Sequence, residues 1–279
     1  MRGARMDLHV LALLLGLATP AFAQSTSAQP ADASTEQHLV PPPSWMFNDL
    51  ACAARLTTEA PPPLRVVGSQ DIVIKRMLGP GDTLLISGGT AAGLQPGQEY
   101  YVRRTVSSFG AKGPDPEHPR IVHTAGWIKI LGADAAVATA TIVHACDGIL
   151  LDDYLEPFEA PMIAAAPLAG GTPRYANMGH IAVGDEAMQN VGAGQLIGID
   201  RGANRGVIMG QRYLVYRDKS SLLNETGGYS AAYVEGARHL PLVELGEVVV
   251  VAVRPNDATV QVLVAKDAIT TGDLIAEIR

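Results

Sequence analysis

The amino-acid sequence predicts an all-β protein made of two tandem, similar small β-barrel or sandwich modules, preceded by a short N-terminal helix. From Leu64 onward, short β-branched and apolar runs are separated by Gly, Asp and Pro, which is the pattern of strands joined by turns. An internal repeat is the second observation: residues 81–102 and 194–215 match at a constant offset of 113, with identity at eight of 22 positions. A repeated pattern of strands and turns indicates a duplicated module.

The first matching block shares residues that shape the backbone. Glycine supplies the positive φ of sharp turns and lets strands cross closely. A tyrosine that opens a paired strand can bury its ring and keep its hydroxyl at the rim. We expect Leu94 and Val207 to plug the ends of the two barrels. The pairs that agree are Gly81/Gly194, Ile86/Ile199, Gly89/Gly202, Gly93/Gly206, Gly97/Gly210, Gln98/Gln211, Tyr100/Tyr213 and Val102/Val215.

The second matching block lies at an offset of 120, which places seven additional residues in the loop 218–238 of the second copy. Loops absorb such insertions at low cost. Chance agreement between selected windows is the alternative, and it predicts unlike surroundings for Gly89 and Gly202. The pairs of this block are Ala138/Ala258, Thr139/Thr259, Ala145/Ala265, Asp147/Asp267, Ile149/Ile269 and Asp153/Asp273.

The expected strands follow the two copies. In the first they are 64–67, 83–87, 99–106, 127–131, 136–144 and 154–155, with an exposed loop over 109–120. In the second they are 181–183, 195–199, 212–217, 243–254, 259–265 and 274–278. The predicted modules are therefore residues 64–160 and 179–279, joined by a linker over 161–178 without a strand period.

The N-terminal region predicts export. Arg2 and Arg5, an apolar run over 8–18 and an A-x-A site before Gln24 form the pattern of a signal peptide over 1–23. Residues 24–43 are expected to be a disordered linker. Residues 44–63 are expected to hold a helix of about three turns, with Ser44 as N-cap, and a Pro-rich segment. Trp45 and Phe47 are expected to pack at the start of this helix.

Two cysteines, Cys52 and Cys146, remain after the predicted cleavage. An even number of cysteines in an oxidising compartment favours a disulfide, here one that closes a long loop. Two buried thiols are the alternative. No CxxC motif or obvious Cys/His framework is present, which argues against a catalytic thiol.

The aspartates that the two copies share are best explained by turns. Asp147 and Asp267 follow a long strand, and an Asp there can accept hydrogen bonds from turn amides, as can Asp153 and Asp273 before the final strand. A metal or acid/base site is the rival interpretation, and it would use Asp147, Asp152, Asp153 and Glu156. The second copy has Gly272 and Ala276 in place of Asp152 and Glu156, which disfavours that site.

Histidines and sequence motifs give no evidence for a cofactor or a reaction. His118, His123 and His144 share no zinc-ligand spacing. The motifs GxSxG, SxxK, HExxH and the phosphate-binding loop are absent from the sequence. We therefore predict no catalytic, cofactor-binding or metal-binding residue.

Composition restricts the partners. The formal net charge of −7 argues against nucleic acid and anionic lipid. Beyond the predicted signal, no apolar run reaches the roughly 18 residues of a membrane helix, and no cysteine follows the apolar run to carry a lipid anchor. The expected location is the periplasm, with association to the outer membrane as a further option.

A resemblance to known modules rests on G-D-T-L-L-I-x-G-G-x-x-x-G-L-x-x-G-Q-x-Y-x-V-R-R over 81–104, followed by a hairpin and D-x-I-x-x-x-D at Asp147–Asp153. This pattern resembles the C-terminal domain of flagellar assembly protein T and β-rich modules found beside LysM domains in peptidoglycan-associated proteins. It covers roughly residues 65–160 and 180–279. The resemblance implies small barrel-like domains and a structural or binding role at the cell envelope, with no catalytic residue to carry over.

The expected function is that of a non-enzymatic, exported cell-envelope scaffold or assembly factor with envelope proteins as partners. The alternative is a module protein that binds peptidoglycan or an exported polysaccharide. An enzyme with its site between the modules would require Asp147, Asp152 and His144 around one cleft.

Overall fold

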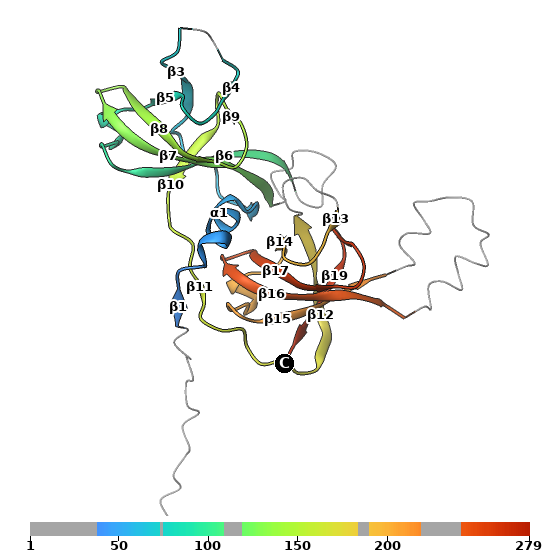
Figure 1. The fold of residues 1–279 in the computed structure, drawn as a ribbon. Coiled ribbons are helices and arrows are strands. Elements are labelled where there is room, and N and C mark those ends of the chain that lie inside the picture. Colours follow the sequence, from blue (N-terminus) through green and yellow to red (C-terminus); the bar gives the residue numbers. More distant parts are fainter. Residues whose placement is uncertain (1–37, 73–74, 109–118, 184–189, 219–240) are drawn as a thin grey trace, which may run out of the picture. The chain divides into compact units, whose positions relative to one another are not determined.

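The computed structural model describes residues 38–72, 75–108, 119–183, 190–218 and 241–279. Over these ranges the chain is dominated by strands, which confirms the predicted all-β class (Figure 1). Apart from two short 3-10 turns, α1 (Ser44–Cys52) is the only helix that the described residues form.

The first module is a β sheet with the order β10-β6-β7-β8-β5-β3. An isolated bridge between Arg65 and Tyr154 connects its two ends, with hydrogen bonds from Val66 N to Asp153 O and from Leu155 N to Leu64 O. The sheet therefore curves round to meet itself. Its strands are β3 (Val66–Ser69), β5 (Thr83–Ser87), β6 (Glu99–Ser108), β7 (Arg120–Ala133), β8 (Val137–Ala145) and β10 (Tyr154–Pro157).

The second module is a closed barrel with the order β12-β14-β17-β16-β15-β19. The first module has the same order when it is read from its other end, as β3-β5-β8-β7-β6-β10. A small two-stranded sheet accompanies each module, β4 (Met77–Leu78) with β9 (Ile149–Leu150) and β13 (Asn190–Val191) with β18 (Ile269–Thr270). The barrel strands are β12 (Pro173–Val183), β14 (Leu196–Ile199), β15 (Arg212–Arg217), β16 (Val243–Val253), β17 (Ala258–Ala265) and β19 (Leu274–Ile278).

Each module has its own apolar core. In the first, the fully buried side chains include Leu84, Ile86 and Ile128, and in the second Ile197, Ile199 and Leu245. Leu94 and Val207 are buried at equivalent positions, 0% and 3% exposed, in the cores that they were predicted to plug. Alternation of inward apolar and outward polar residues along the strands supplies these cores.

Several predicted boundaries are corrected by the structure. β7 begins at Arg120, seven residues before the predicted start, because its first part is covered by β2 (Arg55–Thr57). β12 begins at Pro173, inside the predicted linker, and pairs there with β19. The first residues of β12 are mostly exposed and pair with β19 alone, so no alternation of apolar and polar residues marks this part of the strand. The loops predicted over 109–120 and 218–238 lie almost wholly outside the described residues.

The predicted linkers also contain strands. β1 (Leu39–Val40) pairs with β11 (Ile163–Ala164), and the pairing is extended by a hydrogen bond from Ala165 N to His38 O. Strands of two residues are too short for a sequence period to show. α1 begins at Ser44, one residue before the start that an N-cap at Ser44 implies. Its N-cap is Pro43 and no side chain caps it, so the assignment of Ser44 as N-cap was wrong.

Candidate functional site

A short N-terminal segment, residues 44–57, contacts both modules, and we call it the strap. It consists of α1 and β2 with the turn between them. Along α1, Met46 and Leu50 pack in one apolar cluster with Leu196, Val249 and Val251 of the second module. Burying a large apolar side chain contributes about 1.5–3 kcal/mol, so these two residues form a substantial attachment.

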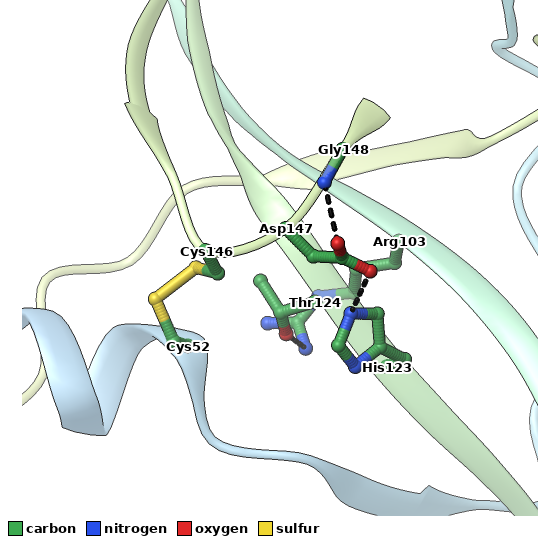
Figure 2. The surroundings of a disulfide bond; sticks show 7 residues. All are labelled: Cys52, Arg103, His123, Thr124, Cys146, Asp147 and Gly148. Atoms are coloured by element: carbon green, nitrogen blue, oxygen red, sulfur yellow. Dashed lines mark hydrogen bonds and ion pairs between the residues drawn. A yellow bond between two sulfur atoms is a disulfide. The ribbon is translucent and has the colours of Figure 1, made fainter. Parts of the chain in front are cut away.

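Aromatic rings and a disulfide attach α1 to the first module. Phe47 meets Trp127 edge to face, with ring centroids 6.2 Å apart, and Ala51 is buried in the same cluster. Cys52 at the end of α1 is bonded to Cys146 after β8, which confirms the predicted disulfide (Figure 2). Trp45 is 65% exposed, so the expectation that it packs at the helix start was wrong.

The end of the strap, β2, also joins two parts of the chain. Its residues pair antiparallel with the first residues of β7. Leu56 packs with Ala182 and Val183 of β12, and its backbone N–H donates to Asp257 Oδ2 at 3.1 Å. The buried carboxylate of Asp257 is in turn held by Arg254 through Nε at 2.9 Å and 3.0 Å. The strap is thus hydrogen-bonded to both modules.

A cleft of about 580 Å³ opens beside the strap. It is bounded by the end of α1 and β2, by β6, by the segment that follows β10, and by residues 252–254 of the second module. Its charged lining residues carry both signs: Arg55, Arg103, Arg254, Glu59, Glu156 and Glu159.

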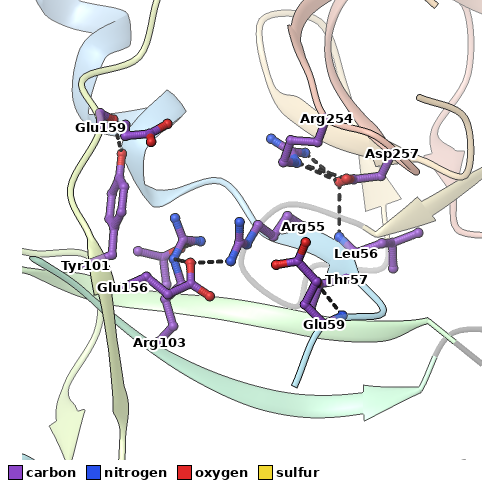
Figure 3. A network of polar contacts seen from close by, with 11 residues as sticks. Arg55, Leu56, Thr57, Glu59, Tyr101, Arg103, Glu156, Glu159, Arg254 and Asp257 are labelled. Atoms are coloured by element: carbon purple, nitrogen blue, oxygen red, sulfur yellow. Dashed lines mark hydrogen bonds and ion pairs between the residues drawn. The ribbon is translucent and has the colours of Figure 1, made fainter. Parts of the chain in front are cut away.

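Glu156 lies at the centre of the charged network, between two arginines (Figure 3). Arg55 donates to Glu156 Oε2 through Nη2, and Arg103 Nε lies 3.1 Å from the same oxygen. Arg103 is only 6% exposed; its Nη1 donates to Thr124 Oγ1 at 2.9 Å and its guanidinium lies over the Tyr101 ring, 4.2 Å from the centroid. Burial, together with the charge of Arg55, lowers the pKa of Arg103 to about 10, so the side chain is still charged at neutral pH.

Tyr101 forms the aromatic wall of the cleft. Its hydroxyl donates to the carbonyl oxygen of Glu159 at 2.8 Å, and its ring packs against Phe158 with centroids 4.6 Å apart. Burial raises the pKa of the Tyr101 hydroxyl, so it remains a neutral donor. The segment after β10 is therefore fixed to β6 by a ring and a hydrogen bond.

The repeat glycines occupy matching backbone positions in the two modules. Each copy has a 3-10 turn, η1 (Thr90–Ala92) and η2 (Ala203–Arg205), that ends at a left-handed glycine, Gly93 and Gly206. A Cβ on Gly89 would lie 2.1 Å from Asp134 O, and one on Gly202 would lie 2.2 Å from Arg254 O. The two carbonyls are themselves 120 residues apart, so both glycines permit a close crossing at the matching position. Their backbone conformations differ, because Gly89 has a positive φ of 44° and Gly202 is extended with a φ of −137°. Gly97 and Gly210 also share a positive φ.

The repeat tyrosines and aspartates form a second matching set. Tyr100 is partly buried and Tyr213 fully buried at the start of β6 and β15. Asp153 Oδ2 accepts from Leu150 N at 2.8 Å, and Asp273 Oδ2 accepts from Thr270 N at 2.7 Å. Asp147 and Asp267 each accept from the next residue's N–H at 2.7 Å. In the first copy, the cysteine of the disulfide immediately precedes Asp147.

An arginine completes this turn in both copies, and we call the pair Arg104–Asp153 or Arg217–Asp273 the latch. Arg104 Nε lies 3.1 Å from Asp153 Oδ1, and Arg217 Nε donates to Asp273 Oδ1 at 2.8 Å. Each arginine also donates to a carbonyl of the turn, Gly148 O or Ala268 O. Desolvation raises the pKa of Asp153 despite its ion pair with Arg104.

The acidic and histidine residues of the rival interpretations are not gathered at one point. Asp152 has a positive φ of 74° and an exposed carboxylate 3.7 Å from Arg65, whereas Glu156 belongs to the cleft. His123 Nε2 lies 3.3 Å from Asp147 Oδ2, and His118 lies outside the described residues. Over the described ranges, the group able to hold a metal contains His144 with Cys52 and Cys146, and none of these carboxylates.

Sequence reasoning missed the cleft residues Arg55, Arg103 and Arg254. A signal was present, because Arg103 follows three apolar or aromatic residues within a predicted strand, where an arginine must be paired or exposed. The sequence suggested its partner Glu156 only for the rival metal or acid/base site. An ion pair between distant residues depends on which strands are neighbours in the sheet, and the sequence pattern alone does not give the order of the strands.

No family model matches the chain, and no curated protein matches it. No helix in the described ranges combines the length and the apolar character needed to cross a membrane.

Proposed function

We propose that this protein is an exported, non-enzymatic component of the bacterial cell envelope that acts as a scaffold or assembly factor. The observation that carries the proposal is that charged groups of the cleft form ion pairs with one another and with neighbouring side chains. Glu156 holds Arg55 to Arg103, and Asp257 holds Arg254 and the strap backbone. Four of the six charged side chains that line the cleft, Arg55, Arg103, Arg254 and Glu156, are thus committed to ion pairs where separate parts of the chain meet, which suits a protein that positions others.

The proposed location rests on the disulfide and on the predicted signal peptide. A disulfide that spans 94 residues is stable in an oxidising compartment such as the periplasm and is rare in the cytosol. The acidic net charge of −7 disfavours nucleic acid as a partner. Envelope proteins are the proposed partners, with the inter-module cleft as the surface that receives them.

The alternative proposal is binding of peptidoglycan or an exported polysaccharide. One observation favours it: the cleft presents cationic, anionic and aromatic groups within about 580 Å³, a volume suited to a small ligand. A peptidoglycan stem peptide carries both carboxylate and ammonium groups, which such a lining could pair. Neutral polysaccharide would instead depend on Tyr101, the aromatic side chain that lines the cleft.

A paired experiment separates the two proposals. A photo-crosslinking residue is placed at Met162 on the cleft lining in the exported full chain, and at Lys266 on the surface of the second module as control. The scaffold proposal predicts protein adducts at Met162 that are absent at Lys266, with no retention of the chain on purified sacculi. Retention on sacculi without protein adducts would contradict the scaffold proposal and support the alternative.

A further inference from the structure

The side chain of His144 lies beside the disulfide. It lies near the end of β8, two residues before Cys146. Its ring stacks on Trp127 with centroids 4.6 Å apart and an interplanar angle of 27°. Within the described chain, neither ring nitrogen has a hydrogen-bond partner, so the imidazole can act as a ligand. A neutral imidazole nitrogen is the commonest protein ligand of transition metals.

The two sulfur atoms of the disulfide complete a set of three donors. Cys52 Sγ, Cys146 Sγ and a ring nitrogen of His144 all lie within 4.8 Å of one another. All three residues are partly exposed, so solvent and small reductants can reach them. In a tetrahedral zinc site with Zn–S of about 2.3 Å and Zn–N of about 2.0 Å, donors lie roughly 3.5–3.8 Å apart. The present spacing needs only a small movement to reach that geometry.

Reduction would free both sulfurs without releasing the helix that carries Cys52. α1 is still held by Met46 and Leu50 in one cluster and by Phe47 and Ala51 in another. The two thiols would therefore stay close to His144 after the covalent bond is gone. This differs from a surface disulfide between loops, whose thiols separate on reduction.

We propose that Cys52, Cys146 and His144 form a redox-gated site for a thiophilic metal ion, represented by Zn²⁺. A dithiol supplies two electrons and two protons, the S–S bond breaks, and the dithiol leaves as its own disulfide. Binding of Zn²⁺ then displaces the two thiol protons, and the ion takes two thiolates and one imidazole. Two Cys and one His with a fourth position for water is a donor set that zinc uses in enzymes.

Neighbouring carboxylates do not belong to the site. Asp147 follows Cys146 directly, but its oxygens are taken by the N–H of Gly148 and by His123 (Figure 2). The metal would close the same 94-residue separation as the disulfide and so substitute for it as a cross-link. The proposal is independent of the proposed scaffold function, because it concerns the strap attachment alone.

The experiment uses the full chain with Trp45→Phe. The sequence has two tryptophans, so this substitution leaves Trp127 as the only one. Zn²⁺ is added without oxygen to the chain after reduction and removal of the dithiol, and to the oxidised chain. The expected result for the reduced chain is one ion bound, two protons released, and a change in Trp127 fluorescence. The oxidised chain should bind none. His144→Ala should weaken binding by at least about tenfold, since even loss of an outer-shell partner has such an effect.

Matched variants make the outcome decisive. His123→Ala should bind Zn²⁺ as the parent does, and Cys52→Ser with Cys146→Ser should lose binding. Equal binding by oxidised and reduced chains, unchanged affinity in His144→Ala, or no binding by the folded reduced chain would each overturn the proposal. If reduction abolishes the strand signal in circular dichroism, its recovery on addition of Zn²⁺ supports the site, and failure to recover overturns it.

Discussion

The two modules keep the same turns and differ where the strap attaches. In both, a glycine, Gly89 or Gly202, packs closely against the backbone carbonyl of another segment. Both also hold the last turn with an arginine–aspartate latch. The first module holds the strap by a disulfide, by aromatic packing against Trp127 and by the pairing of β2 with β7, and the second holds it by apolar packing and by Asp257. Val137 stands at the position of Asp257 in the first copy. These differences between the modules lie at the junction with the strap, which is where we place the function.

The largest expected effect comes from removing the attachment that only the first module has. Replacing Cys52 and Cys146 by Ser should lower the free energy of unfolding by about 3–5 kcal/mol, because the bond constrains a long loop in the unfolded chain. Chemical denaturation of the full chain measures the loss. Hydrogen exchange should show faster opening around β8 than around β17. Equal acceleration in both modules would contradict the comparison.

A matched pair of glycine substitutions tests whether the crossings are equivalent. Gly89→Ala and Gly202→Ala should each destabilise the chain by roughly 2–4 kcal/mol, because a backbone carbonyl at 2.1 Å or 2.2 Å leaves no space for a Cβ. Gly68→Ala and Gly192→Ala are the controls, since their nearest atoms lie at 3.7 Å and 3.9 Å. Urea unfolding compares the four. A large loss at one crossing and none at the other would break the equivalence of the modules.

The latch predicts a smaller, again matched, effect. Arg104→Leu or Arg217→Leu should cost about 1.5–3 kcal/mol, the usual range for a hydrogen bond to a charged group, since each leaves a buried aspartate without its cation. Thermal unfolding at neutral pH provides the values. If one of the two substitutions leaves stability unchanged, the latch stabilises one module only, and the equivalence of the modules at this turn is contradicted.

The smallest expected effect is a pH dependence that arises from Asp153 in the first module. Desolvation raises the pKa of Asp153 in the folded chain above the ordinary aspartate value. Its contribution to stability is then fully present below the unfolded pKa and is lost as the pH rises through the folded pKa. An NMR titration of the Asp153 carboxyl carbon measures the folded value. Asp153→Asn should remove this part of the stability profile, and an unchanged profile would contradict the assignment.

Much of the fold was predictable, because strand periods and turn residues are local. The bounds of β5, β15 and β19 matched the predicted ranges, and the disulfide was predicted from the cysteine number and compartment. The two-residue strands β1 and β11 were not predictable, since pairing across more than 120 residues leaves no local pattern. The residues singled out from the sequence lie in turns, which local patterns reveal. The cleft instead depends on the ion pair between Arg103 and Glu156, which lie on different strands.

The central claim is that the strap joins two similar modules into one cooperative unit, and calorimetry of the oxidised full chain tests it most directly. The account predicts a single unfolding transition whose calorimetric and van't Hoff enthalpies agree. Leu50→Asp, which places a charge in the cluster with Val249 and Val251, should split that transition in two. Two separate transitions in the unsubstituted chain, unaffected by Leu50→Asp, would contradict the account.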